Sequence, residues 1–264
     1  MRASHPPFAA ALLALLLTAC APRQSAAVNI DGSTSMERVM SVLQESFPTP
    51  EITVNLSGTG SGAGIEAVLS GTCDIGLSSR PLKPAEEEKG AEAHLIALDG
   101  IALAVHPSNP VTDLTTEELA AIFTGRLTNW RQLGGNDAPI AVCGREAGSG
   151  SRSAFESVIG AEDRCRYTNE YGSTGDIIGS VSLNPNAIGY VSPASVNDSV
   201  SVLRVNGIRC TAESIRSGEY PFQRPFLMIT CRGVPLSPAA QSFLDYARSS
   251  EAAAAITFAG AVPP

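Results

Sequence analysis

Residues 139–160, PIAVCGREAGSGSRSAFESVIG, decide how the chain folds, because three kinds of local structure follow one another there without a break. Pro139–Cys143 is an apolar run of strand length, and Gly144–Arg152 is rich in glycine and serine. In the part that follows, apolar residues recur at helical spacing at Phe155, Val158 and Ile159. The segment therefore predicts a strand, a tight polar loop and a helix, in that order.

Two segments nearer the N-terminus repeat this order. The strand predicted at Val28–Asp31 runs into Gly32-Ser33-Thr34-Ser35, and the strand predicted at Ile52–Ser57 runs into Gly58-Thr59-Gly60-Ser61-Gly62. Each loop leads into an apolar pattern of helical period. Thr34-x-x-Glu37 has the form of a capping box, which predicts that the first of these helices begins at Thr34.

The remaining sequence continues to alternate between strand and helix patterns. Further strands are expected at Cys73–Leu77, His94–His106, Ala187–Val191 and Phe226–Cys231. Further helices are expected at Pro84–Lys89, after the Thr115-x-x-Glu118 capping box, at Gly175–Ser182 and after Ser237-Pro238. Such alternation is typical of α/β proteins, in which helices pack on largely parallel sheets. With 264 residues, the chain is long enough for two such units.

The three glycine- and serine-rich loops each precede a helix, and a helix N-terminus is a natural anion site. Its first backbone N–H groups have no partner within the helix, and the helix dipole places partial positive charge there. Arg145, four residues before Ser149, adds a planar donor that matches an oxyanion. A serine before a helix is more often an N-cap than a ligand. These residues alone therefore indicate only a site for a small anion or another polar ligand.

Composition and motifs argue against several other functions. A net charge of −8 disfavours nucleic-acid binding, which relies on basic patches. There is no P-loop and no GxSxG motif, and the GxGxxA match at Gly62–Ala67 lacks the acidic residue expected about 20 residues later. His94 and His106 are far from Ser149 in sequence, which argues against a serine hydrolase without excluding it. No cysteine spacing suggests a metal site, and no cofactor is expected.

The N-terminal residues have the features of an export signal. Phe8–Leu17 is an unbroken apolar run preceded by Arg2, too short to span a bilayer, and it is followed by Leu17-Thr18-Ala19-Cys20. This end resembles the bacterial lipobox, in which cleavage leaves a lipidated cysteine, here Cys20, at the N-terminus. Residues 1–19 are then a lipoprotein signal peptide, and 20–27 a tether. The alternative is an ordinary signal peptide with an incidental cysteine.

Five further cysteines would remain in the exported chain, where disulfides can form. They are Cys73, Cys143, Cys165, Cys210 and Cys231. Because the number is odd, at least one is unpaired. Two bridges among five cysteines can be arranged in 15 ways, and the sequence does not choose between them. The pairs closest in sequence, Cys143–Cys165 and Cys210–Cys231, are the pairings we expect.

A set of short motifs spread over residues 28–232 resembles a known family, the substrate-binding lipoproteins of bacterial phosphate ABC transporters. The most specific is Arg145-Glu146-x-Gly148-Ser149-Gly150-Ser151-Arg152, together with Asn129-Trp130. The other matching segments are Asp31–Ser35, Gly60–Ile65, Asp74–Arg80, Asp99–Ala102, Asn109–Val111, Ile122–Gly125 and Ala187–Val191.

The resemblance implies a type II periplasmic-binding-protein fold, in which two α/β lobes joined by two crossover strands close on a ligand. Residues 28–104 plus 197–264 would form lobe 1, and 105–196 lobe 2. It also implies a lipid-anchored protein that binds inorganic phosphate in the periplasm or on the outer face of the cytoplasmic membrane. Its partners would be the membrane permease subunits of a phosphate ABC transporter. Binding would involve no catalysis, metal or nucleic acid.

By motif match, the ligand-binding residues implied by the resemblance come from both lobes. They are Thr34, Ser35, Ser61, Ser79, Arg80, Arg145, Ser149, Gly150 and Ser151. Two positions depart from well-known members. Ser79 stands where those members have a carboxylate that accepts a proton from phosphate and so helps reject sulfate, and Ala147 replaces an Asp that in some members partners the site arginine.

Three alternatives to a phosphate receptor stay open at this point. One is a receptor for another oxyanion, such as sulfate or molybdate. Another is a secreted phosphate-recognising hydrolase with Ser149 as its nucleophile, although such an enzyme needs a base beside that serine. The third is a surface protein that reuses the fold for adhesion or signalling.

Overall fold

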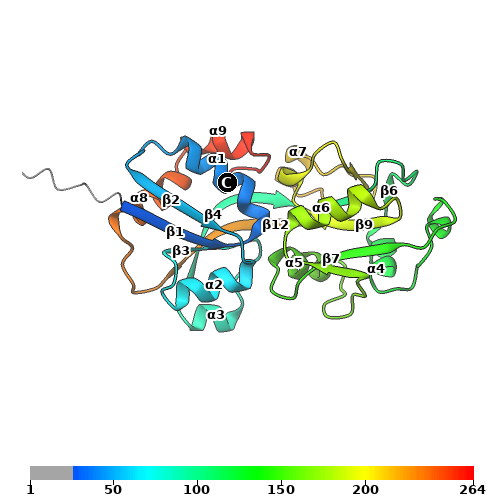
Figure 1. Ribbon diagram of the computed structural model, residues 1–264, viewed down its shortest axis with the longest axis horizontal. Helices are drawn as coiled ribbons and strands as arrows, with labels where there is room; N and C mark the ends of the chain where they lie inside the picture. Colours follow the sequence, from blue (N-terminus) through cyan, green and yellow to red (C-terminus); the bar gives the residue numbers. More distant parts are fainter. Residues whose placement is uncertain (1–25) are drawn as a thin grey trace, which may run out of the picture.

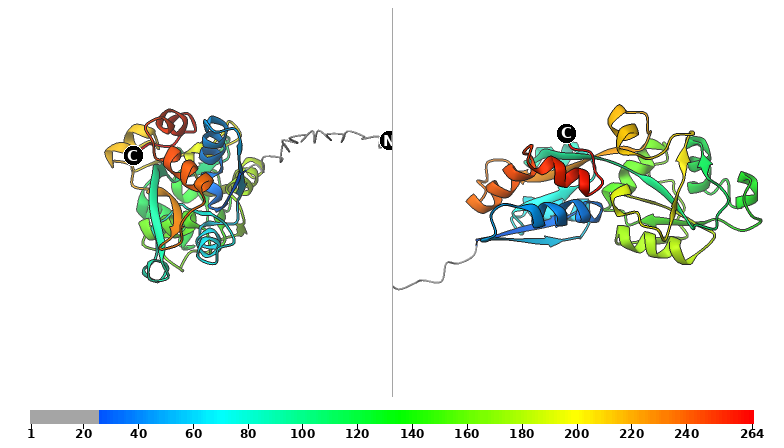
Figure 2. Two further views of the ribbon diagram at one scale, coloured as in Figure 1. Left: turned by 90° about the vertical axis from the view of Figure 1, so that its left-hand side faces the viewer. Right: turned by 90° about the horizontal axis from the view of Figure 1, so that it is seen from above.

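The computed structural model of the protein describes residues 26–264, which form two lobes lying side by side (Figure 1). Each lobe is built around its own five-stranded sheet. Seen from above, the lobes are separate masses joined by strands that cross between them (Figure 2). This is the two-lobed α/β architecture that the resemblance implied.

The first lobe contains the N-terminal strands and the last long strand of the chain. Its sheet has the order β2-β1-β3-β12-β4, formed by β1 (Ala26–Gly32), β2 (Ile52–Ser57), β3 (Ile75–Ser78), β4 (Ala91–Gly100) and β12 (Gln223–Cys231). Its helices are η1 (Thr34–Met36), α1 (Glu37–Ser46), α2 (Ser61–Leu69), α3 (Pro84–Glu88), α8 (Pro238–Ala247) and α9 (Ala252–Phe258). Strand β12 runs antiparallel to both β3 and β4, so the sheet is mixed and not largely parallel as expected.

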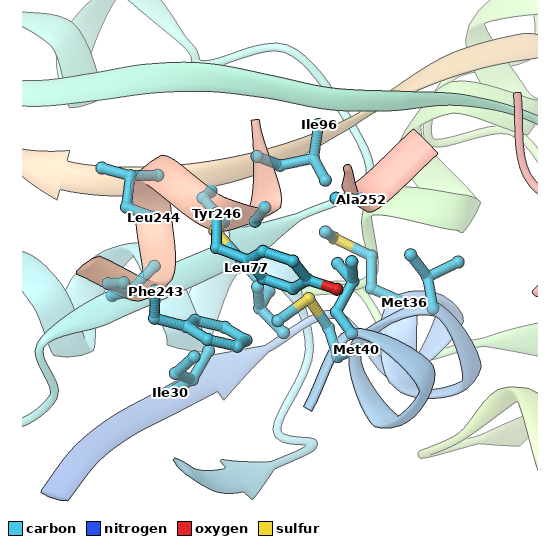
Figure 3. Packing of buried hydrophobic residues seen from close by; sticks show 14 of the residues in the cluster. Ile30, Met36, Met40, Leu77, Ile96, Phe243, Leu244, Tyr246 and Ala252 are labelled. Atoms are coloured by element: carbon cyan, nitrogen blue, oxygen red, sulfur yellow. The ribbon is translucent and has the colours of Figure 1, made fainter. Parts of the chain in front are cut away.

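Apolar residues of α1, α8 and α9 pack with those of the sheet to form the main core of this lobe. On α1, Met40 and Leu43 lie three positions apart and are completely buried, as the helical pattern predicted. They belong to one cluster with Phe243 of α8 and with Ile30 and Leu77 of strands β1 and β3 (Figure 3). This packing fixes α1 on the sheet, and with it the loop that precedes α1.

The second lobe is built from the middle of the chain. Its sheet has the order β10-β5-β9-β7-β8, formed by β5 (Ala102–Val105), β7 (Ala141–Arg145), β8 (Asn169–Tyr171), β9 (Ala187–Val191) and β10 (Ser201–Val202). A small second sheet pairs β6 (Asp113–Leu114) with β11 (Arg204–Val205). The helices are α4 (Thr116–Phe123), η2 (Trp130–Leu133), α5 (Gly150–Val158), α6 (Thr174–Leu183), η3 (Pro193–Ser195) and α7 (Ala212–Ser217). The Thr115 capping box that begins α4 is formed as predicted.

The chain crosses between the lobes at two adjacent places. The apolar run His94–His106, expected as a single strand region, is two strands in different sheets, because β4 ends at Gly100 and β5 begins at Ala102. On the return, Phe222 packs in the core of the second lobe and β12 of the first lobe begins one residue later. The Ile101 N–H donates to the Phe222 carbonyl over 2.9 Å, so the two connections are hydrogen-bonded to each other.

These crossings displace the expected lobe boundaries. Residues 102–104, expected in lobe 1, pair with β9 in the second sheet. Residues 197–222, also expected in lobe 1, contain β10, β11 and α7, which pack in the second lobe. An apolar strand pattern cannot show where a chain changes sheets when both sheets are buried on both faces. Ala26 and Ala27, expected in the tether, are the first residues of β1.

The described cysteines form no disulfide. Cys73, Cys143, Cys165, Cys210 and Cys231 are all free thiols, so the expected Cys143–Cys165 and Cys210–Cys231 pairings are wrong. The predicted signal peptide 1–19 and Cys20 lie outside the described residues. Within residues 26–264, no helix is both long enough and apolar enough to cross a bilayer.

Candidate functional site

Four helix N-termini meet where the two lobes face each other. The sequence predicted three of them, namely η1 leading into α1, α2 and α5, and the fourth belongs to α6. The Gly62 N–H at the start of α2 donates to the Gly148 carbonyl before α5 over 3.0 Å. The Thr174 N–H at the start of α6 donates to the Thr34 hydroxyl over 3.3 Å. Loops far apart in sequence are therefore in direct contact across the lobes.

The predicted capping box at Thr34 is not formed. Ser33 occupies the N-cap position, and Thr34 opens a single turn of 3-10 helix that continues into α1 at Glu37. Neither Ser33, the N-cap of η1, nor Met36, the N-cap of α1, makes a side-chain cap hydrogen bond. The Thr34 hydroxyl faces the second lobe, where Thr174 donates to it, so a residue that sequence spacing assigned to capping contributes to the contact between the lobes.

A chain of three hydroxyls crosses the site between two arginines. Ser151 Oγ lies 2.7 Å from Ser35 Oγ, and Ser35 Oγ lies 3.2 Å from Thr174 Oγ1. At one end of the chain, Arg145 Nη1 donates to Thr174 Oγ1 over 3.3 Å. At the other end, Arg224 Nη1 donates to Ser151 Oγ. All five side chains are buried, so the chain is removed from solvent.

A second group of hydroxyls lies beside this chain. Ser33 Oγ donates to Ser79 Oγ over 2.9 Å, and Ser61 Oγ lies 3.3 Å from Ser79 Oγ. Ser61 and Ser79 are completely buried. Gly150 packs against this pair, because a Cβ built on Gly150 would lie 2.7 Å from Ser79 Oγ and even closer to Ser61 Oγ. The first turn of α5 thus lies directly against hydroxyls of the first lobe.

Arg145 ends β7 and is fixed by an acidic neighbour. Its Nε donates to Glu146 Oε2 over 2.9 Å, and its Nη2 donates to Glu146 Oε1 over 3.0 Å and to the Gly172 carbonyl over 2.8 Å. These contacts leave Nη1 directed at Thr174. Although Ala147 stands where some members have an Asp, the arginine has a carboxylate partner one position earlier.

Arg224 has an equivalent partner in Asp99, and sequence analysis assigned no role to either. Both side chains are fully buried, and Arg224 Nη2 donates to Asp99 Oδ2 over 2.8 Å. Asp99 Oδ1 accepts a hydrogen bond of 3.1 Å from Ser192 of the second lobe. Burial raises the pKa of the Asp99 carboxyl to about 6, although the charge and hydrogen bonds of Arg224 act in the opposite direction.

Two expected site residues are placed differently from the others. The Arg80 guanidinium is directed at α3, where it binds both carboxylate oxygens of Glu86 over 2.8 and 2.7 Å. It donates also to the Pro81 carbonyl over 2.9 Å. Ser149 lies in the contact region and is buried, but its hydroxyl accepts from the Arg152 N–H as the N-cap of α5. The structure therefore brings together all the predicted residues except the Arg80 head group.

The site is rich in donors and poor in acceptors. Arginine N–H groups and helix N–H groups only donate, and hydroxyls supply a proton as well as an acceptor. The carboxylates of Glu146 and Asp99 are occupied by the arginines. Such a site matches a small ligand made of acceptor oxygens, which is the chemistry of an oxyanion.

Histidine or metal chemistry has no support at these residues. His94 Nε2 bonds to Thr230 within the first sheet, and His106 Nδ1 bonds to Ser108 of the second lobe. Neither histidine bonds to Ser149, the nucleophile of the hydrolase alternative. Among residues 26–264, no group of histidine, cysteine and carboxylate side chains is arranged to hold a metal ion.

Thr174 and Arg224 are the site residues that sequence analysis missed. Ser173 caps α6 by accepting from the Asp176 N–H, so the serine before Thr174 was a usable signal of a fourth helix start. Arg224 is the single charged residue within the apolar strand β12, and the strand was predicted to begin only at Phe226. A buried charge in an apolar strand requires a partner, which in this fold is Asp99.

Comparison with known proteins gives concordant results. The family model described as PBP superfamily domain matches residues 19–251. The phosphate-binding protein PstS of Bacillus subtilis is 32% identical over 242 residues, which cover 87% of this chain and 77% of that protein. The PstS of Borreliella burgdorferi is 29% identical over 84% of this chain and 85% of its own length.

Two solved structures are similar to this chain over almost their whole length. A phosphate ABC transporter substrate-binding protein from Clostridium perfringens, solved with bound phosphate, superposes with a TM-score of 0.87 at 40% identity. The superposition covers 90% of this chain and 99% of that one. An ABC-type phosphate transport receptor from Vibrio cholerae superposes with a TM-score of 0.73 at 35% identity, covering 90% of this chain and 100% of that one.

Proposed function

The chain belongs to the PBP superfamily, and we propose that it is a phosphate receptor. In this proposal it binds inorganic phosphate outside the cytoplasmic membrane and delivers it to an ABC permease. The observation that carries the proposal is the buried chain of hydroxyls between Arg145 and Arg224, at the meeting point of four helix N-termini. The similarity to PstS proteins, and to a receptor solved with bound phosphate, supports phosphate as the ligand.

Binding is proposed to close the two lobes around the anion without any chemical step. The ligand-binding residues in this proposal are Thr34, Ser35, Ser61, Ser79, Arg145, Ser149, Gly150 and Ser151. They lie on both lobes, so an anion held by all of them bridges the lobes. Arg80 is omitted because its guanidinium is occupied by Glu86.

Selectivity for phosphate is proposed to rest on hydroxyl acceptors. Hydrogenphosphate carries a proton that needs an acceptor, whereas sulfate carries none. The Ser79 hydroxyl oxygen can accept a hydrogen bond from that proton, but a neutral hydroxyl repels a fully ionised anion less than a carboxylate does. We therefore expect weaker discrimination against sulfate than a carboxylate at this position would give. A receptor for sulfate or molybdate is the second candidate.

Membrane attachment and the transport partner complete the proposal. Lipidation of Cys20 would tether the folded lobes at the outer face of the cytoplasmic membrane or in the periplasm, within reach of the permease subunits. The net charge of −8 becomes −9 when the signal peptide with Arg2 is removed. That global charge does not oppose phosphate capture, because the local donors of the site act at contact distance.

Calorimetric titration of the purified protein with phosphate, sulfate and molybdate at two pH values tests this function. We expect phosphate to bind at micromolar concentration or below and to bind more tightly than sulfate. Absence of phosphate binding contradicts the proposal, and tighter sulfate or molybdate binding favours the second candidate. Turnover of a phosphomonoester that is lost in Ser149→Ala would instead indicate the hydrolase.

A further inference from the structure

We infer that Arg224 is a second arginine ligand of the bound anion and that Asp99 is its positioning residue. This inference rests on the proposed function and deepens it, because it assigns a site role to two residues outside the glycine- and serine-rich loops. Three observations on the described residues support it. They are the position of the Asp99–Arg224 pair in the sheet, the direction of the Arg224 guanidinium, and the equivalent hydrogen bonds of Arg145.

The pair lies where the chain crosses between the lobes. Asp99 near the end of β4 and Arg224 near the start of β12 are direct partners in the strand register. Both side chains are completely buried, which is costly for charged groups even when they are paired. The sheet of the first lobe therefore carries a buried ion pair at its edge toward the second lobe.

The guanidinium of Arg224 is oriented so that one nitrogen faces the site. Nε and Nη2 both donate to Asp99 Oδ2, over 3.0 and 2.8 Å. The remaining nitrogen, Nη1, donates to the Ser151 hydroxyl in the first turn of α5. An ion pair that served only to join β4 to β12 would not need this third contact, which reaches the other lobe.

The same construction is present at Arg145. There Nε and Nη2 donate to the Glu146 carboxylate, and Nη1 donates to the Thr174 hydroxyl in the first turn of α6. Two arginines thus approach one chain of hydroxyls from opposite ends, each fixed by an acid on the same two nitrogens. Arg145 belongs to the expected binding residues, and the equivalent geometry assigns Arg224 to the same task.

Asp99 also connects the pair to the second lobe. Its Oδ1 accepts from Ser192, which follows β9, while its Oδ2 holds Arg224. The carboxylate is thereby fixed from both lobes when they are closed. An Asp99 carboxylate fixed in this way holds the Arg224 guanidinium in the orientation that points Nη1 at α5.

The test measures phosphate affinity of the purified full-length chain by calorimetry for the wild type, Arg224→Gln and Arg224→Lys. Removing a buried ligand arginine is expected to weaken phosphate binding by roughly 30-fold or more. Arg224→Lys keeps the charge and is expected to recover part of that loss. Arg131→Gln is the control, because it removes one positive charge and an ion pair with Asp137 at an exposed position.

Structural damage is separated from loss of a ligand contact by a parallel measurement. Thermal unfolding without phosphate reports the stability of each variant, and affinity is compared only between variants that are folded at the titration temperature. If Arg224→Gln proves unfolded, Arg224→Lys carries the test. Wild-type affinity in a folded Arg224 variant overturns the inference while leaving phosphate binding intact. A wild-type protein that does not bind phosphate overturns both.

Asp99→Asn tests the positioning role by the sign of its effect. If only charge mattered, removal of a negative group beside the site would strengthen anion binding. A positioning role predicts weaker binding, and also predicts that Asp99→Asn adds no further loss to Arg224→Gln. Unchanged or tighter binding in Asp99→Asn overturns the assignment of Asp99.

Discussion

Gly150 in the first turn of α5 lies so close to Ser61 in the first turn of α2 that a Cβ on Gly150 would collide with the Ser61 hydroxyl, which leaves no room for a side chain between the lobes. Two helices from different lobes thus approach end to end at the anion site. The tight approach depends on glycine at this one position, and it links closure of the lobes to the contacts that a bound anion would receive.

A methyl group at this contact is expected to obstruct closure. In Gly150→Ala the added Cβ would meet the hydroxyls of Ser61 and Ser79, so phosphate binding is expected to weaken by about 1–3 kcal/mol. Gly148→Ala is the matched control from the same loop, because a Cβ there has no neighbour within 4 Å. Calorimetric affinities of the two variants check this. Equal affinities would show that closure tolerates the extra atom.

Loss of the first arginine is expected to be severe. Arg145→Ala removes a buried donor and leaves Glu146 without its partner, so phosphate affinity should fall by about 2–5 kcal/mol. Titration calorimetry measures the effect directly. An unchanged affinity would mean that the anion binds elsewhere.

Arg80 is expected to affect stability and not binding. Its guanidinium pairs with Glu86 on α3, and the two side chains are only 7% and 17% exposed. Arg80→Gln should therefore lower the free energy of unfolding by about 1–3 kcal/mol and leave the phosphate affinity unchanged. Urea unfolding measures the free energy of unfolding, and calorimetry of the same preparation measures the phosphate affinity. Weaker binding at equal stability would return Arg80 to the ligand-binding set.

A carboxylate in place of Ser79 is expected to sharpen selectivity. Ser79 lies within 2.9 Å of Ser33 Oγ and 3.3 Å of Ser61 Oγ, so Ser79→Asp would place negative charge among the hydroxyls of the site. The carboxylate would accept a hydrogen bond from the protonated oxygen of hydrogenphosphate and would repel fully ionised sulfate. The ratio of sulfate to phosphate dissociation constants should rise by about tenfold or more. Competition titrations measure this ratio, and a constant ratio would contradict the role assigned to position 79.

The buried Asp99 carboxyl predicts a specific dependence of stability on pH. Burial raises its pKa from the ordinary value of 3.8 to about 6. Between these values the folded chain keeps a proton that the unfolded chain has lost, so this group lowers the free energy of unfolding as pH rises from about 4 to about 6. The full effect is about 2–3 kcal/mol. Asp99→Asn lacks this contribution.

Urea unfolding of the wild type and Asp99→Asn at several pH values isolates that contribution. The stability of the variant relative to the wild type should increase between pH 4 and pH 6 and be constant above pH 7. A difference that does not change with pH would contradict the raised pKa.

The local order of strands and helices could be predicted because it depends on short-range patterns. The strands before each glycine-rich loop and the helix cap at Thr115 follow from apolar period and capping chemistry. The lobe boundaries could not be predicted in the same way. Residues 94–106 have strand-like apolar patterns on both sides of Ile101, and only the pairing partners show that the chain changes sheets there.

The site residues that belong to sequence motifs could be predicted, but those that depend on contacts between distant parts of the chain could not. Ser35, Arg145 and Ser151 belong to loops whose composition already indicates an anion. Arg224 is 125 residues from Asp99 in the chain, and no local pattern connects them. Thr34 was named as a site residue by motif match, but its spacing to Glu37 also predicted a helix cap, and its hydroxyl bonds across the lobes instead.

The two crossing connections lie next to each other, joined by the hydrogen bond from Ile101 to Phe222 and continued by the pairing of β4 with β12. Two hydrogen-bonded strands bend together as one ribbon, which resists sliding and stretching much more than bending. We therefore expect the lobes to open and close by a hinge rotation at this ribbon. Asp99 and Arg224 are register partners within this ribbon, so a bend there would move the Arg224 guanidinium relative to Ser151 of the second lobe.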